Sequence, residues 1–90
     1  MAQVFDPRAR IIGFLNGQAL DISSAEFAAI VAQNPAKDVS WHIGQIDLTE
    51  DAASVRVDCR DWTGNNYTDF LHMLRNDGSW HIVNKLFHAF

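Results

Sequence analysis

The chain has 90 residues, and its 11 acidic and seven basic side chains give a formal net charge of −4. A chain of this length forms one domain, so we predict a single domain over residues 1–90. The excess of acid excludes strong attraction to nucleic acid or to an anionic membrane, which needs clustered Lys and Arg. Hydrophobic residues make up 48% of the chain, which argues against disorder.

The first part of the chain predicts a hairpin. Asp6-Pro7 indicates a turn, because Pro pushes the residue before it out of the helical region. Residues 10–15 and 18–22 are typical of strands. Asn16-Gly17 between them favours a type I′ turn, which needs a positive φ at both positions.

One short helix follows the hairpin. Ser23 followed by Glu26 is a capping-box pattern, which predicts that a helix begins here. From Phe27 onward apolar residues recur at helical spacing. Asn34-Pro35 ends this pattern, so we expect a helix of about three turns.

Everything after Lys37 predicts β-structure. Four strands follow one another at residues 39–48, 54–62, 67–75 and 79–90. If Asp77-Gly78 is a two-residue loop, Asn76 lies opposite Ser79, Met73 opposite Ile82 and Leu71 opposite Asn84. This last hairpin carries large apolar groups on both faces, so both faces must be covered.

The same hairpin carries a pattern that resembles a known family. Asp69 precedes the Asp77-Gly78 turn, Trp80 follows it, and residues 82–85 read Ile-Val-Asn-Lys. This pattern resembles the final hairpin of nuclear transport factor 2-like proteins, most closely their lumazine-binding-like and polyketide-cyclase-like branches. Phe5-Asp6-Pro7 resembles the segment that follows the first helices of that family.

The resemblance implies an α+β fold, a cystatin-like cone shortened at its N-terminus. One short helix would pack on a strongly curved, mostly antiparallel sheet of about 4–6 strands. Relatives begin with helices that close the mouth of the sheet, and this chain starts after them. We therefore expect a homodimer or higher oligomer in which a second copy covers the exposed sheet face. That face would carry Leu71, Met73, Trp80 and Ile82.

The resemblance also implies a small-molecule pocket on the concave face of the sheet. By alternation, Asp69 shares that face with Asn84, and the resemblance supports these two as a polar pair. Trp41 and Gln45 share one face of an earlier strand, from which they could join the pair. The predicted ligand-binding residues are Trp41, Tyr67, Asp69, Trp80 and Asn84.

Asp69 is the candidate catalytic base. A carboxylate in an apolar pocket has a raised pKa and can remove a proton next to a carbonyl group. His88 or Tyr67 would then act as the acid. In the alternative interpretation, Asp69 bonds Asn84 or a backbone N–H and only fixes the register of the hairpin.

Other features of the sequence bear on cellular location, membrane contact and the binding of metals or cofactors. No apolar run approaches the ~18 residues that span a bilayer, and the N-terminus does not resemble a signal peptide, so we expect a cytoplasmic protein without membrane contact. Cys59, the single cysteine, is expected to be a small buried hydrophobe. The histidines lack zinc-site spacing, so we predict no metal, and nothing indicates a cofactor. They are His42, His72, His81 and His88.

Three functions remain open from the sequence. The first is a homodimeric module that binds a small apolar or aromatic ligand or another protein. The second is an isomerase, cyclase or dehydratase that uses Asp69 as its general base. The third is a structural or interaction protein without a ligand.

Overall fold

The computed structural model describes residues 4–34, 39–62 and 64–90. Its elements follow in the predicted order, which is confirmed: two strands, one helix and four strands. They are β1 (Phe5–Leu15), β2 (Gln18–Ser23), α1 (Ser24–Gln33), β3 (Ser40–Thr49), β4 (Ala52–Trp62), β5 (Asn65–Asn76) and β6 (Ser79–Ala89). Within these residues, no helix is long and apolar enough to cross a membrane.

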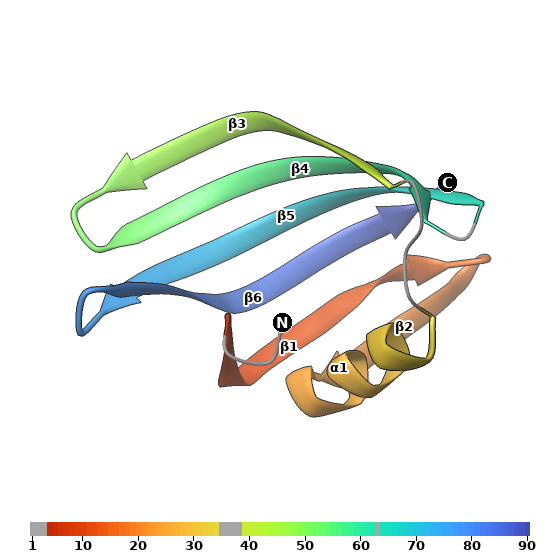
Figure 1. The fold of residues 1–90 in the computed structure, drawn as a ribbon, viewed down its shortest axis with the longest axis horizontal. Helices are drawn as coiled ribbons and strands as arrows, with labels where there is room; N and C mark the ends of the chain where they lie inside the picture. The colour runs from red at the N-terminus through yellow and green to blue at the C-terminus, as the bar shows by residue number, and fades with distance from the viewer. Residues whose placement is uncertain (1–3, 35–38, 63) are drawn as a thin grey trace.

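The six strands form one curved sheet in the order β2-β1-β6-β5-β4-β3 (Figure 1). All neighbours are antiparallel except β1 and β6, which are parallel. The predicted α+β class and mostly antiparallel sheet are confirmed. The predicted turn at Asp6-Pro7 is wrong, because both residues lie inside β1, in a stretch where its register with β6 is irregular.

Local chemistry explains the two tight hairpins. Asn16 and Gly17 have φ angles of 52° and 79°, and Asp77 and Gly78 have φ angles of 52° and 78°. Positive φ at both central residues is the signature of the type I′ turn, whose twist matches that of the flanking strands. Both predicted hairpins are confirmed.

The predicted capping box forms at the start of α1. Glu26 N donates to Ser23 Oγ, and Ser23 N donates to Glu26 Oε1, both at 3.1 Å. These two bonds satisfy backbone donors that have no partner within the helix. Asn34 caps the other end, where its N–H donates to the carbonyl oxygens of the last turn. Pro35, the other half of the predicted stop signal, lies outside the described residues.

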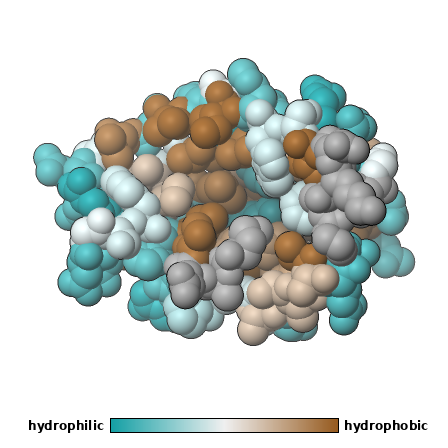
Figure 2. Space-filling model, viewed as in Figure 1, coloured by the Kyte–Doolittle hydropathy of each residue, from teal (hydrophilic) through white to brown (hydrophobic). Residues whose placement is uncertain are grey.

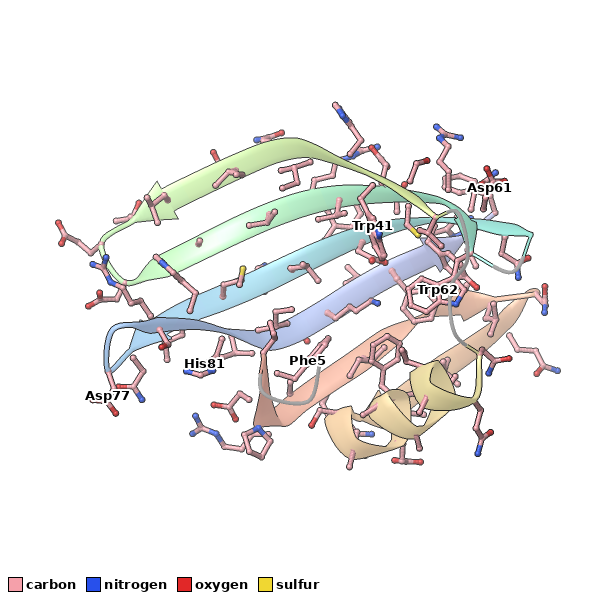
Figure 3. The ribbon with its side chains drawn as sticks, viewed as in Figure 1. Phe5, Trp41, Asp61, Trp62, Asp77 and His81 are labelled. Atoms are coloured by element: carbon pink, nitrogen blue, oxygen red, sulfur yellow. The ribbon has the colours of Figure 1, made fainter. Side chains whose placement is uncertain are left out.

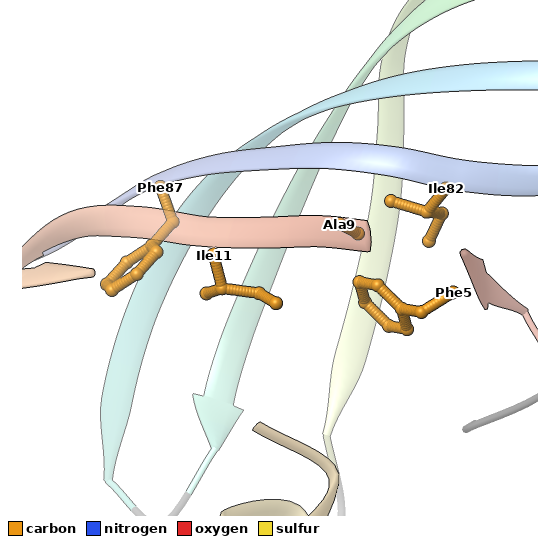
Figure 4. Close-up of a cluster of buried hydrophobic side chains, with 5 residues drawn as sticks. All are labelled: Phe5, Ala9, Ile11, Ile82 and Phe87. Atoms are coloured by element: carbon orange, nitrogen blue, oxygen red, sulfur yellow. The ribbon is translucent and has the colours of Figure 1, made fainter. Parts of the chain in front are cut away.

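Helix α1 packs on the concave face of the sheet at its β1–β2 end (Figure 1). The Phe27 ring meets the Phe5 ring edge to face, with 5.6 Å between centroids. Phe5 also belongs to a buried apolar cluster from β1 and β6 (Figure 4). Its members are Phe5, Ala9, Ile11, Ile82 and Phe87. One end of the sheet thus holds the core, and strands β3 to β5 extend beyond the helix.

A bulge at Val83 breaks the predicted register of the last hairpin. The pairing is as predicted from Asn76–Ser79 to Met73–Ile82, but His72 then pairs with Asn84. Strand β6 therefore holds one residue more than β5 at this point. Because side chains alternate along a strand, one extra residue moves every later side chain of β6 to the other face. The predicted register beyond the bulge is wrong.

A second bulge, at Gly44, likewise moves the later side chains of β3 to the other face of the sheet. Ile43 pairs with Val57 and Gln45 pairs with Arg56, so Gly44 is the extra residue. Trp41 consequently lies on the concave face with Ile43, whereas Gln45 lies on the convex face. The prediction that Trp41 and Gln45 share a face is wrong for this reason.

The exposed apolar surface differs from the predicted one. Ile82 is buried, because β1 lies beside β6 and Phe5 pairs with it. Leu71, Met73 and Trp80 are half-buried. The concave side of the edge strand β3 is more exposed, with fractions of 54–62% for Trp41, Ile43, Ile46 and Leu48. Hydrophobic residues gather over strands β3 to β6 in Figure 2.

Gly13 is required by the close approach of β1 to β6. A Cβ at this position would lie 2.7 Å from ring atoms of Phe87 and even closer to its carbonyl oxygen. We expect Gly13→Ala to lower the free energy of unfolding by about 1–3 kcal/mol, the usual cost of overpacking. Gly44→Ala is the matched control, since its Cβ would meet Arg56 Cδ at an ordinary 3.6 Å. Urea unfolding of both variants tests this, and equal stabilities would contradict it.

Candidate functional site

A cavity of about 120 Å³ lies between α1 and the concave face of the sheet. Its walls are mainly apolar and come from both ends of the chain; they include Ile11, Leu20, Phe27, Trp41, Trp62 and Phe87. Trp41 and Trp62 meet edge to face with 5.8 Å between ring centroids (Figure 3). Trp62 is anchored by its indole N–H, which donates to the carbonyl oxygen of Asn34 at 3.2 Å.

A buried ion pair forms the polar part of this cavity. Lys85 Nζ lies 3.5 Å from Asp69 Oδ2, and the two side chains are only 14% and 8% exposed. Asp69 pairs with Phe87 and Leu71 pairs with Lys85 across β5 and β6, so the charged residues are diagonal neighbours on the concave face. The bulge at Val83 is what places Lys85 on this face.

Aromatic rings surround the ammonium group. Lys85 Nζ lies 4.3 Å from the centroid of the Phe27 ring and 6.0 Å from that of Phe87. Ring faces attract a cation, and this attraction grows when water is excluded. The helix therefore contributes to the charged site through Phe27, as well as to the apolar wall.

One oxygen of Asp69 is left without a partner. Oδ1 is buried and makes no hydrogen bond with any residue that the structure describes. A buried acceptor without a donor costs free energy, and most such atoms in proteins are paired. Asp69 is one of the residues that line the cavity.

Burial shifts both pKa values of the pair. Desolvation raises the pKa of Asp69, and the charge and hydrogen bond of Lys85 only partly oppose this shift. Desolvation also lowers the pKa of Lys85, against the attraction of Asp69. Both shifts favour the neutral forms, so a proton moves from the ammonium to the carboxylate at less cost than in water.

The structure brings three predicted site residues together. Trp41, Tyr67 and Asp69 all line the cavity. Burial raises the pKa of the Tyr67 hydroxyl, which stays protonated as a hydrogen-bond donor near neutral pH. Cys59 also lines the cavity; it is buried, as predicted, and burial raises the pKa of its thiol.

Three other predicted residues lie elsewhere. Asn84 pairs with His72, and His88 pairs with Thr68, so both point to the convex face, away from Asp69. The predicted polar pair of Asp69 with Asn84 is wrong, because the bulge at Val83 moves Asn84 to the other face of β6. For the same reason His88 does not lie near Asp69 as the predicted acid. Trp80 lies near the β5–β6 turn, where the Arg75 guanidinium stands 5.5 Å from its ring, outside the cavity lining.

Sequence reasoning missed Lys85 as a site residue. The signal was present, because a lysine stands between Val83 and Phe87 in a strand rich in apolar residues. In the predicted register, however, this lysine fell on the face opposite Asp69. Phe27 and Trp62 were also missed as cavity residues. The local sequence does not show which strands will pack against a helix or against the end of another strand.

The chain resembles a set of known proteins. A family model described as "Putative lumazine-binding" matches residues 1–88. The aldolase FrzH of Cladobotryum sp is 31% identical over 88 residues, which cover 96% of this chain and 70% of that protein.

The chain is also similar to solved structures. An NTF2-like protein of unknown function from Methylobacillus flagellatus KT is 30% identical, with a TM-score of 0.91 over 100% of this chain and 74% of its own. A second, from Silicibacter pomeroyi DSS-3, is also 30% identical, with a TM-score of 0.91 over 98% and 75% of the two chains. A domain with a cystatin-like fold from Nostoc punctiforme shares the fold at 18% identity, with a TM-score of 0.73 over 97% and 61%.

The shifted pKa values predict opposite titrations for two aspartates. We expect the Asp69 carboxyl to titrate above its ordinary pKa of 3.8 and Asp58 to titrate below it, because Thr68 Oγ1 donates to Asp58 Oδ1 at 2.7 Å. Side-chain carbon NMR across pH 2–8 measures both. Asp69 should titrate still higher in Lys85→Met, which removes the opposing charge.

The pKa shifts of Asp69 and Asp58 make the free energy of unfolding depend on pH in opposite directions. Asp69 binds its proton more tightly in the folded state, so its contribution to the free energy of unfolding falls as pH rises from 3.8 through its folded pKa. The contribution of Asp58 is present above 3.8 and is lost as pH falls through its folded pKa. A measured Asp69 pKa at or below 3.8 would contradict the predicted titration, because the charge of Lys85 would then lower this pKa by at least as much as desolvation raises it.

Proposed function

Since this chain belongs to the "Putative lumazine-binding" family of nuclear transport factor 2-like proteins, we propose that its cavity binds a small apolar or aromatic molecule that carries a hydrogen-bond donor. The cytoplasm is the proposed location. Cys59 is the single cysteine of the chain, so no disulfide can form within it, as is common for proteins of a reducing compartment.

The unpaired oxygen of Asp69 carries this proposal. The cavity is otherwise lined mainly by apolar and aromatic groups, so a ligand gains most of its affinity from burial of its own apolar surface. A hydroxyl or N–H on that ligand would satisfy Asp69 Oδ1. A hydrogen bond to a charged group is worth about 1.5–3 kcal/mol, enough to orient the ligand.

Aromatic side chains favour a flat ligand. Trp41, Trp62 and Tyr67 all line the cavity. The rings of Trp41 and Trp62 meet edge to face, as do those of Tyr67 and Phe87. Such rings pack well against another aromatic body. The Tyr67 hydroxyl adds a second polar contact for the same ligand.

Acid–base catalysis is the second candidate function. The relationship to a protein described as an aldolase and the raised pKa of Asp69 favour it. Asp69 would remove a proton from the carbon next to a carbonyl, and the electron pair would move onto the carbonyl oxygen. The Lys85 ammonium would stabilise the negative charge that develops there, and Tyr67 replaces His88 as the candidate acid.

A fluorescent probe with a hydroxyl donor tests the binding proposal. We expect 2-naphthol to bind about tenfold more tightly than 2-methoxynaphthalene, because only the former donates to Asp69. Asp69→Leu should abolish this preference. Asp58→Asn, on the convex face, is the matched control and should leave it unchanged. Equal affinities of the two probes for the unmodified protein, or no binding of either, would refute the proposal.

We further propose that the protein acts as a homodimer in which a second copy covers the concave side of β3. Ile46 and Leu48 are 58% and 62% exposed there, in line with Ile43. Burial of such a row stabilises association by roughly 25 cal/mol per Å² of apolar surface. Light scattering should give twice the monomer mass of 10.1 kDa.

A double variant locates the interface. Ile46→Lys with Leu48→Lys should give a folded monomer, whereas Ser54→Lys, on the convex face, should leave the dimer intact. A 10.1 kDa particle for the unmodified protein at micromolar concentration would contradict the dimer.

A further inference from the structure

Lys85 occupies an unusual environment for a lysine. Its side chain is 14% exposed, and Lys85 is one of the residues that line the cavity. Lysine is almost never fully buried unless it is paired, because its ammonium group is strongly hydrated. The structure therefore places an amine inside an apolar cavity, where a small molecule can reach it.

The ion pair of Lys85 and Asp69 is poorly suited to a purely structural role. The Nζ–Oδ2 distance of 3.5 Å is longer than the ~2.7–2.9 Å of a strong charge-assisted hydrogen bond. The second oxygen of Asp69 has no partner among the described residues. A buried ion pair offsets its desolvation cost only when its geometry is good and the remaining polar atoms are satisfied.

We propose that Lys85 Nζ is a nucleophile that forms an imine with an aldehyde or ketone bound in the cavity. The inference deepens the proposed function, on which it rests, because it names carbonyl compounds as the ligand class. The carbonyl carbon would meet Nζ, and the apolar body of the ligand would lie against the wall formed by Trp41 and Phe27. A donor group on the ligand would reach Asp69 Oδ1.

The step balances without any further reactant. Asp69 takes one proton from the ammonium, and the neutral amine then attacks the carbonyl carbon, so that a C–N bond forms, the π bond of the carbonyl breaks, and one proton passes from the nitrogen to the carbonyl oxygen. The hydroxyl so formed leaves as water with the proton returned by Asp69, while the nitrogen loses its other proton to solvent as the C=N bond forms. No group is oxidised or reduced.

The electrostatics of the site support this role. Burial lowers the pKa of Lys85, so a larger share of this amine is neutral near pH 7 than for an ordinary lysine. Burial raises the pKa of Asp69, which makes its carboxylate a stronger proton acceptor than that of an ordinary aspartate. The two carboxylate oxygens differ in their surroundings, since Oδ2 lies 3.5 Å from Lys85 Nζ and Oδ1 has no hydrogen-bond partner among the described residues.

Reductive trapping tests the inference directly. The chain has two lysines, Lys37 and Lys85, so peptide mapping assigns an adduct without ambiguity. The unmodified protein is incubated at pH 7 with 4-hydroxybenzaldehyde, which has an aromatic body and a hydroxyl donor, and with cyanoborohydride, which reduces an imine to a stable amine. We expect Lys85 to be labelled at least about tenfold faster than Lys37, because the cavity would hold the aldehyde beside Nζ.

Two arginine variants provide the controls. Lys85→Arg keeps a cation beside Asp69 but cannot form an imine, so labelling at this position should vanish. Lys37→Arg should retain labelling at Lys85. The rate at Lys85 should also reach half of its maximum at a lower pH than the rate at Lys37.

The outcomes separate this inference from the proposed function. If 2-naphthol binds and Lys85 reacts no faster than Lys37, the imine inference fails and the binding proposal survives. If 2-naphthol does not bind and Lys85 is not labelled selectively, both fail. Selective labelling of Lys85 that persists in unfolded protein would also overturn the inference, because the reactivity would not come from the cavity.

Discussion

The bulge at Val83 determines the chemistry of the cavity. Side chains alternate along a strand, so one extra residue in β6 moves Lys85 and Phe87 to the concave face and Asn84 to the convex face. Asp69 on β5 consequently lies beside a lysine where a uniform register would give it an asparagine. A neutral amide could only hold the carboxylate by hydrogen bonds, whereas an amine can also exchange a proton with it.

Burial and charge oppose each other at this pair. The curved sheet and α1 remove Asp69 and Lys85 from water, which destabilises both charged forms. Their mutual attraction and the ring of Phe27 compensate in part. The same conflict that costs stability brings the proton affinities of the two groups closer together than they are in water.

The small helical layer explains the distribution of the apolar surface. Helix α1 covers the β1–β2 end, where Ile11 and Ile82 are buried, and the described residues place no second helix over β3. The sheet therefore divides into a packed end, which builds the cavity, and an extended end, where the apolar side chains of β3 are exposed. The cavity lies at the border between them, where Trp41 and Trp62 meet.

Local chemistry made most of the fold predictable from the sequence. Asn16-Gly17, Asp77-Gly78 and the capping box at Ser23 each act through their own backbone, so their turns and helix start are readable without tertiary contacts. Asp69 was likewise identified as a cavity residue. The two bulges, the burial of Ile82 and the pairing of Lys85 with Asp69 were decided only by tertiary structure. The position of a bulge depends on how two paired strands twist against β1 and the helix. The sequence of one strand does not show at which residue its register with the neighbouring strand will shift.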